Sequence, residues 1–181
     1  MTSLAIIKAR RHTVITKSVI YLIVIVSMGF ASTNELDKSI TNKLALENTE
    51  LANNIGDIGQ YGMVITPFVY SGFQEERWKY LKITSIATGS NYAITGLTKW
   101  VVGRQRPDWS NNKSFFSGHT SSAATASALM CYLKPESCIT MLAATAFVGY
   151  LRIAAMKHYF SDVIVGFYVG YMSGIAVPTI Y

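Results

Sequence analysis

The chain has 181 residues, half of them apolar and 14% charged, with a formal net charge of +6. That length suits one domain, and a charged fraction well below the ~25% of an average soluble domain excludes a disordered or highly solvated protein. The excess of Lys and Arg fits an anionic membrane surface or a phosphate-bearing substrate. The cations form no dense stripe, so we expect no nucleic-acid partner.

The first 34 residues combine a basic start with an apolar segment. An uncharged run, 18–34, follows the four cations Lys8, Arg10, Arg11 and Lys17. The pattern fits a secretory signal peptide cleaved near Ala31, and equally a first transmembrane helix with its basic end in the cytoplasm. A buried helix of a cytosolic domain is a third alternative, which the clustered cations disfavour. We expect residues 1–34 to form this leader and residues 35–181 one helical domain.

Charge interrupts the rest of the chain at regular intervals. Together with 18–34, the uncharged runs make six segments of 14–19 residues, slightly short of the ~20 apolar residues that span a bilayer. They exceed typical strands, lack period-2 alternation and are rich in small residues that let helices approach closely. We therefore predict an all-α fold, a single six-helix bundle embedded in a membrane. The five further runs are 58–74, 83–98, 120–133, 137–151 and 163–181.

The segments between these runs are predicted to be loops and turns. The polar stretch 33–43 is expected to be the loop after the first segment, and 71–73 with the charges after it an exposed turn. Pro135 cannot continue the helix before it, so residues 134–137 are expected to form a break between two helices.

Two cations stand seven residues apart just before a proline. On a helix this spacing places Lys99 and Arg106 on one face, and Pro107 then ends the helix with Arg106 at its mouth. Such a pair can hold an anion, although two cations at a membrane interface give the same pattern.

Ser117, Gly118 and His119 open the next helical segment. Backbone amides at a helix start can bind an oxyanion, and Gly118 lets it come close. Ser117 adds a hydroxyl donor, and His119 could give a proton to a leaving oxygen. Alone, the same residues fit an ordinary helix N-terminus.

A third stretch holds an arginine, a histidine and an aspartate. On a helix, Asp162 lies one turn after His158, so its carboxylate could accept the Nδ1–H and leave Nε2 free as a nucleophile. Arg152 offers a bidentate guanidinium to phosphate oxygens. A His–Asp pair at this spacing is by itself also a common helix-surface contact.

Together, Lys-x6-Arg-Pro, Ser-Gly-His and Arg-x5-His-x3-Asp in this order resemble the three-part signature of the type 2 phosphatidic acid phosphatase superfamily. The resemblance runs from about Gly56 to the C-terminus. This family includes membrane lipid phosphatases, bacterial class A acid phosphatases and vanadium haloperoxidases. Phe116 stands where the family normally has Pro, and Leu151 where it normally has Ser. Neither position transfers protons or the phosphoryl group.

The resemblance implies a phosphatase that needs no metal and no other cofactor. His158 would attack phosphorus to form a phosphohistidine, Asp162 would orient it, and His119 would protonate the leaving alkoxide. The implied substrate ligands are Lys99, Arg106, Ser117, Gly118 and Arg152.

The implied partners are a membrane and a lipid substrate: phosphatidic acid, phosphatidylglycerol phosphate, undecaprenyl diphosphate or a phosphate of lipid A. With six spans and the N-terminus inside, all three motifs fall on the periplasmic face of a bacterial inner membrane, and the turn 134–137 lies inside. The sequence predicts neither the oligomeric state nor a choice among these lipids.

Three alternatives stay open. Signal cleavage would release a soluble periplasmic acid phosphatase, which the modest mean hydropathy favours. A disulfide between Cys131 and Cys138 would place the turn between them in an oxidising compartment and contradict the six-span topology. A vanadium haloperoxidase, typically a much larger protein, and a membrane binding protein with a degenerate site are the remaining alternatives.

Overall fold

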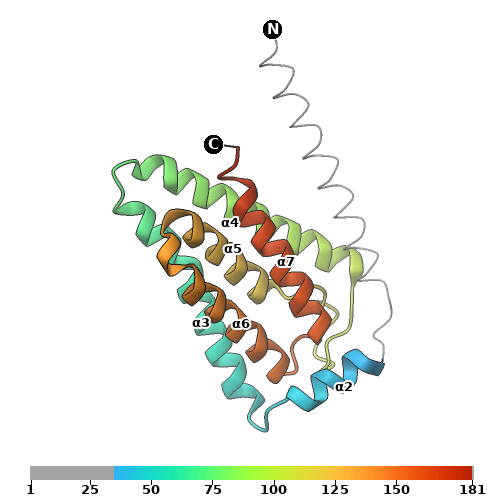
Figure 1. Cartoon of the computed structure of the whole chain (residues 1–181). Coiled ribbons are helices and arrows are strands. Elements are labelled where there is room, and N and C mark those ends of the chain that lie inside the picture. The colour runs from blue at the N-terminus through green and yellow to red at the C-terminus, as the bar shows by residue number, and fades with distance from the viewer. Residues whose placement is uncertain (1–34, 181) are drawn as a thin grey trace. The chain divides into compact units, whose positions relative to one another are not determined.

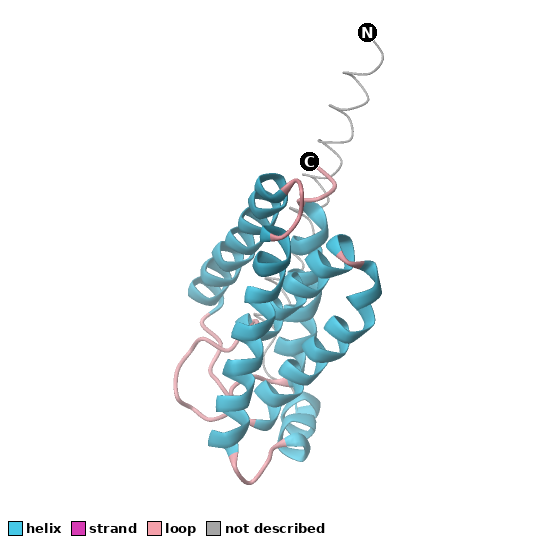
Figure 2. Ribbon diagram, turned by 90° about the vertical axis from the view of Figure 1, so that its left-hand side faces the viewer, coloured by secondary structure: helices cyan, strands magenta, loops and turns pink. Residues whose placement is uncertain are grey.

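The computed structural model describes residues 35–180, which form six α-helices, a short 3₁₀ turn and no β-strand (Figures 1 and 2). The predicted all-α bundle is therefore confirmed, while the leader and the first predicted segment, 18–34, lie outside the described residues. The helices are α2 (Glu35–Leu44), α3 (Thr49–Gly72), α4 (Arg77–Val102), α5 (Gly118–Leu133), α6 (Cys138–Ala154) and α7 (Phe160–Ala176), with the 3₁₀ turn η1 (Pro135–Ser137).

The predicted loop over 33–43 is wrong, because α2 occupies most of it. This helix has acidic residues in its first turn and a lysine in its last, which complements the helix dipole. Its buried face is made of polar side chains, Asp37 and Thr41, one turn apart. A search for apolar periodicity cannot detect a helix that buries polar residues.

Helix α5 forms the centre of the bundle. It contacts α3, α4, α6 and α7, and Figure 1 shows it lying between them. Eleven consecutive residues, Thr120–Met130, are buried, and nine of them are Ala, Ser or Thr. Side chains this small allow four neighbours to pack closely around one helix. The hydroxyls are satisfied within the bundle, as in the contact of Thr125 Oγ1 with the Gly170 carbonyl at 2.9 Å.

Three glycines of α7 spaced four residues apart form the face that packs on α5. A Cβ on Gly170 would lie 1.9 Å from the Ser121 carbonyl oxygen, and one on Gly166 would lie 2.6 Å from the Ser117 carbonyl oxygen. A Cβ on Gly174 would meet the backbone of Thr125 at 2.7 Å. The two backbones can be this close only because α7 has no side chain at these positions.

Gly170→Ala is therefore expected to destabilise the bundle by about 1–3 kcal/mol or more, because the backbone opposite must move. Gly62→Ala on α3 is the matched control, since a Cβ there meets nothing within 4 Å. The control should be neutral or stabilising, because Ala favours a helix over Gly. Thermal unfolding of both variants in detergent measures the difference, and equal melting temperatures would contradict this packing.

The chain brings four helix ends together at one end of the bundle. There α4 ends, α5 begins, α6 ends and α7 begins, and α2 lies across the same end (Figure 1). The prediction that Pro107 ends α4 is wrong: the helix ends at Val102, and Gly103 follows in the left-handed conformation with φ of 57°. This places Arg106 in the loop after α4 and not on the same helical face as Lys99.

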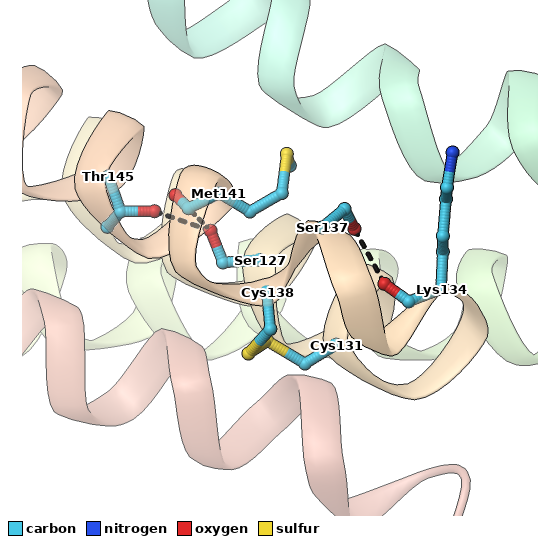
Figure 3. The surroundings of a disulfide bond; sticks show 7 residues. All are labelled: Ser127, Cys131, Lys134, Ser137, Cys138, Met141 and Thr145. Atoms are coloured by element: carbon cyan, nitrogen blue, oxygen red, sulfur yellow. Dashed lines mark hydrogen bonds between the residues drawn. A yellow bond between two sulfur atoms is a disulfide. The ribbon is translucent and has the colours of Figure 1, made fainter.

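The opposite end of the bundle carries two connections. The predicted turn after residue 71 joins α3 to α4, and the predicted break at Pro135 separates α5 from α6. Cys131 and Cys138 flank this break and form a disulfide bond (Figure 3). Within the described residues, one helical stretch, Pro135–Ala154, is both long and apolar enough to cross a membrane.

Candidate active site

A cavity of about 390 Å³ opens where the four helix ends meet. Its wall combines side chains that the sequence places far apart, from α3, α4, α5 and the loops after α4 and α6. Five predicted site residues line it: Lys99, Arg106, Gly118, His119 and His158. The three sequence motifs thus meet at one place, although no two of them lie on the same helix.

Two cations supply the positive charge of this cavity. Lys99 reaches the cavity from the last turn of α4, and its Nζ donates to the Lys113 carbonyl oxygen at 2.6 Å. Arg106 Nε is buried without a hydrogen-bond partner among the described residues. A buried cationic donor without a partner is costly, so the cavity is suited to an anion that accepts from it.

His158 lies in the short loop between α6 and α7, with its side chain almost entirely buried. The predicted helical His–Asp pair is therefore wrong in its local structure, because α7 begins only at Phe160. The Nδ1 atom of His158 lies 2.7 Å from the Ser114 carbonyl oxygen and 3.8 Å from Asp162 Oδ2. Since a carbonyl only accepts, Nδ1 carries the proton and Nε2 is left unprotonated. Burial lowers the pKa of His158 to about 3.

Asp162 is a capping residue of α7 as well as a neighbour of His158. Its Oδ2 accepts from the Tyr159 backbone N–H at 2.9 Å and from Ser114 Oγ at 2.5 Å. Its Oδ1 accepts from Arg104 at 2.6 Å. The carboxylate is fully buried and fixed by three donors.

His119 belongs to a second cluster, centred on Asp57 of α3. Asp57 Oδ1 lies 2.8 Å from His119 Nε2 and accepts from Arg152 Nη1 at 2.9 Å. Burial, followed by the positive charge of Arg152, lowers the pKa of His119 to about 4, although Asp57 acts in the opposite direction. The Arg152 side chain is 3% exposed and reaches the cavity through this shared carboxylate.

The start of α5 has the predicted form, and Ser117 also caps the helix. Ser117 is the N-cap: its buried Oγ accepts from Thr120 Oγ1 at 2.9 Å and weakly from the Thr120 amide at 3.4 Å. Its hydroxyl caps the helix and does not line the cavity. Gly118 does line it, and a Cβ there would lie 3.2 Å from Thr95 and 3.6 Å from Lys99. Glycine thus lets the lysine stem pass over the helix start.

Sequence reasoning missed three residues of this site: Asp57, Arg104 and Ser114. Asp57 is the last charged residue before the uncharged run 58–74, at the end of α3 that meets the motifs. Arg104 stands between the two motif cations. Asp57 and Arg104 could therefore have been proposed as site residues from the sequence, because each is a charged residue close to a motif or to a helix end that meets the motifs. Ser114 gives no signal in the sequence, because its contribution is a loop carbonyl and a hydroxyl brought to Asp162 by folding.

Among the described residues, no group of three or more His, Cys, Asp or Glu side chains is placed to hold a metal ion. The cavity itself offers two histidines in separate hydrogen-bond networks, several cations and the amides at the start of α5. This combination can bind a phosphate group, attack it and transfer a proton.

Comparison with known families agrees with this arrangement. The model of the PAP2 superfamily matches residues 80–181, which include all the motif residues. The chain belongs to the PAP2 superfamily. No curated protein matches it. Membership in this family makes the protein a phosphatase that hydrolyses phosphate esters.

Two solved structures share the fold. One is the first transmembrane PAP2 type phosphatidylglycerolphosphate phosphatase from Bacillus subtilis, with a TM-score of 0.69 and 19% identity over 89% of this chain and 94% of that one. The other is LpxE from Aquifex aeolicus, with a TM-score of 0.63 and 22% identity over 80% of this chain and 93% of that one. At these identities the likeness establishes the all-helical PAP2 fold.

Proposed function

We propose that this protein hydrolyses a lipid phosphate monoester or lipid diphosphate through a phosphohistidine intermediate, without a metal. The observation that carries the proposal is the single cavity in which His158, His119, Lys99 and Arg106 meet. The substrate class is supported by the Bacillus subtilis structure, described as a phosphatidylglycerolphosphate phosphatase.

In the first step, Nε2 of His158 attacks phosphorus, a P–N bond forms and the P–O bond to the lipid alcohol breaks. His119 donates its proton to the departing oxygen. Asp162 and the Ser114 carbonyl hold the imidazole and stabilise the positive charge that develops on it. Water, activated by His119, then attacks phosphorus, breaks the P–N bond and releases inorganic phosphate.

Charge stabilisation comes from the cations that line or adjoin the cavity. Lys99 and Arg106 face the phosphate, and Arg152 adds its charge from behind Asp57. The amides at the start of α5, beginning with Gly118, supply further donors. In this proposal Ser117, the N-cap residue of α5, fixes the backbone at the start of the helix.

The histidine environments predict the pH dependence. His158 is neutral at pH 7, as a nucleophile must be, but His119 must gain a proton before donating it. A phosphate bound beside His119 raises its pKa. We expect both kcat and kcat/KM to give bell-shaped pH profiles. The alkaline limb of kcat/KM, which reports the free enzyme, should lie at lower pH than the alkaline limb of kcat, which reports the enzyme–substrate complex. Steady-state kinetics across the range, corrected for the separately measured ionisation of the substrate, test this. Coincident alkaline limbs, or a monotonic profile, would contradict the assignment of His119.

The outer surface supports a membrane environment. The interior of the bundle is rich in Ser, Thr and Ala, whereas large apolar side chains face outward on four helices, an arrangement that soluble proteins avoid. These exposed side chains include Ile58, Ile65 and Val69 on α3, Leu97 and Val101 on α4, Ile139 and Phe147 on α6, and Ile164 and Tyr168 on α7.

Exposed aromatic residues mark both ends of α4. Trp78 in its first turn is 75% exposed and Trp100 near its end is 84% exposed. At ~1.5 Å per residue, their separation of 22 positions along the helix corresponds to about 33 Å. That matches the ~30 Å hydrocarbon core of a bilayer, with tryptophans at both interfaces. Phe73 and Trp109, also exposed, add to the two aromatic groups.

We propose a multi-pass protein of the bacterial inner membrane with its site on the periplasmic face. The four N-terminal cations and Arg77 and Lys79 at the opposite end of the bundle favour this orientation by the positive-inside rule. The Cys131–Cys138 disulfide opposes it, because the turn would then lie in a reducing compartment. The proposed orientation predicts that both cysteines are alkylated in cells without prior reduction. If they react only after reduction, the turn is extracytoplasmic, and the protein is either soluble in the periplasm or inserted the other way.

Phosphate release by the purified protein in EDTA tests the proposed function. We expect turnover of phosphatidic acid in detergent micelles, with a rate that falls as detergent dilutes the lipid at the micelle surface. A small soluble phosphate ester is the comparison substrate. Preference for the soluble ester would favour a soluble acid phosphatase, and no turnover of either substrate would overturn the proposal.

A further inference from the structure

Behind His158, Arg104 joins two buried carboxylates from opposite ends of the described chain. Arg104 Nη1 donates to Asp162 Oδ1 at 2.6 Å, and its Nη2 donates to Asp37 Oδ2 at 2.7 Å. None of the three side chains is more than 9% exposed. The family model begins at residue 80, so Asp37 and all of α2 lie before the matched region.

Both terminal nitrogens of the Arg104 guanidinium are hydrogen-bonded, whereas its buried Nε has no hydrogen-bond partner among the described residues. The guanidinium donates to Ser161 Oγ at 2.9 Å and lies over the Tyr159 ring, 4.5 Å from the ring centroid. Asp37 is fixed equally well, because it accepts from the Ser161 backbone N–H at 3.0 Å and from Ser161 Oγ at 2.6 Å. These contacts tie α2 to the first turn of α7, the turn that contains Asp162.

A buried ion triad is costly unless every charge is paired and hydrogen-bonded, and replacing one by apolar residues is often neutral for stability. The triad is therefore weak evidence of a purely stabilising role. Here the triad controls the orientation of Asp162. Arg104 fixes Oδ1, so Oδ2 accepts from Ser114 Oγ and the Tyr159 amide and faces His158 Nδ1. Without the anchor on α2, the guanidinium would be free to turn away from the carboxylate.

We propose that Arg104 and Asp37 are positioning residues that hold Asp162, and through it His158, in the geometry for nucleophilic attack. Helix α2 is thereby a part of the active centre. The inference rests on the proposed function, because it assigns Asp162 and His158 to phosphoryl transfer.

The variants Asp37→Asn and Arg104→Gln test this, with Glu35→Gln as the matched control. Glu35 is also a carboxylate of α2, but it is exposed and pairs only with Lys38 in the described structure. We expect kcat to fall by about tenfold to 100-fold in both test variants, since small displacements away from the reacting atoms have effects of that size. KM should stay within a few fold, because neither residue lines the cavity. The control should match wild type.

The two test residues belong to one chain of contacts, so their effects should not add. The double variant is expected to be no slower than the slower single variant, which is the signature of coupled positions. Arg104→Lys, which keeps one charged donor, should recover part of the lost rate. A merely structural role would instead lower the fraction of folded protein and leave kcat per folded molecule unchanged, which would overturn the proposal.

A spectroscopic readout separates this inference from the proposed function. The chain has three histidines, so in ¹⁵N-histidine-labelled protein the His158 Nδ1–H signal is identified by its loss in His158→Ala. Asp37→Asn and Arg104→Gln should shift or broaden that signal, and Glu35→Gln should not. If the signal moves but wild type hydrolyses no lipid phosphate, the positioning role stands and the function fails. If wild type is active and neither the signal nor kcat changes, the positioning role fails.

Discussion

Replacing His158 by Ala is expected to lower kcat by about 10⁴-fold or more, because its Nε2 is the nucleophile in the proposed mechanism. The imidazole is fully buried behind the cavity, and its Nδ1 is bound to the Ser114 carbonyl, so only Nε2 can face phosphorus. Phosphate release from phosphatidic acid in EDTA measures the loss.

The covalent intermediate gives the sharper version of this experiment. Protein quenched in alkali during turnover of ³²P-labelled substrate should retain label on a histidine, and the label should be released by acid. His158→Ala should retain none. Label retained by this variant, or residual turnover near the wild-type rate, would assign the nucleophile to another residue.

The sequence predicted the helices well where apolar runs are long. Five of the six predicted segments overlap α3 to α7, because the charged residues between the runs cluster at or near the helix ends. It failed at α2, whose buried residues are polar and whose partners, Arg104 and Ser161, lie far away in sequence. A helix stabilised by long-range polar contacts leaves no local pattern to detect.

The site was predictable in its residue types but not in its connections. The three motifs meet in one cavity, as the resemblance implied, yet Gly103 ends α4 before Arg106, and His158 lies outside any helix. The spacing arguments assumed continuous helices, whereas the left-handed turn at Gly103 and the loop before α7 change which atoms meet. Asp57 shows the same limit: nothing in the spacing indicated that it would pair with both His119 and Arg152.

The second large effect is expected at His119, and it should depend on the leaving group. His119→Asn removes the proposed proton donor, so hydrolysis of an alkyl phosphate such as phosphatidic acid should slow by about 10²–10⁴-fold. An ester with an acidic leaving alcohol, such as p-nitrophenyl phosphate, needs little protonation. Its first step should therefore be nearly unaffected, and a burst of nitrophenol should precede slow turnover.

Slow turnover after the burst follows because, in the proposed mechanism, the same histidine activates the water that hydrolyses the phosphohistidine. The labelled intermediate should accordingly accumulate in His119→Asn, whereas it is absent from His158→Ala. Asp57→Asn provides an intermediate case: it leaves both histidines in place but removes the carboxylate 2.8 Å from His119 Nε2, so the alkaline limb of kcat should move to lower pH. Equal slowing of both esters in His119→Asn, without a burst, would show that His119 acts in binding and not as the acid.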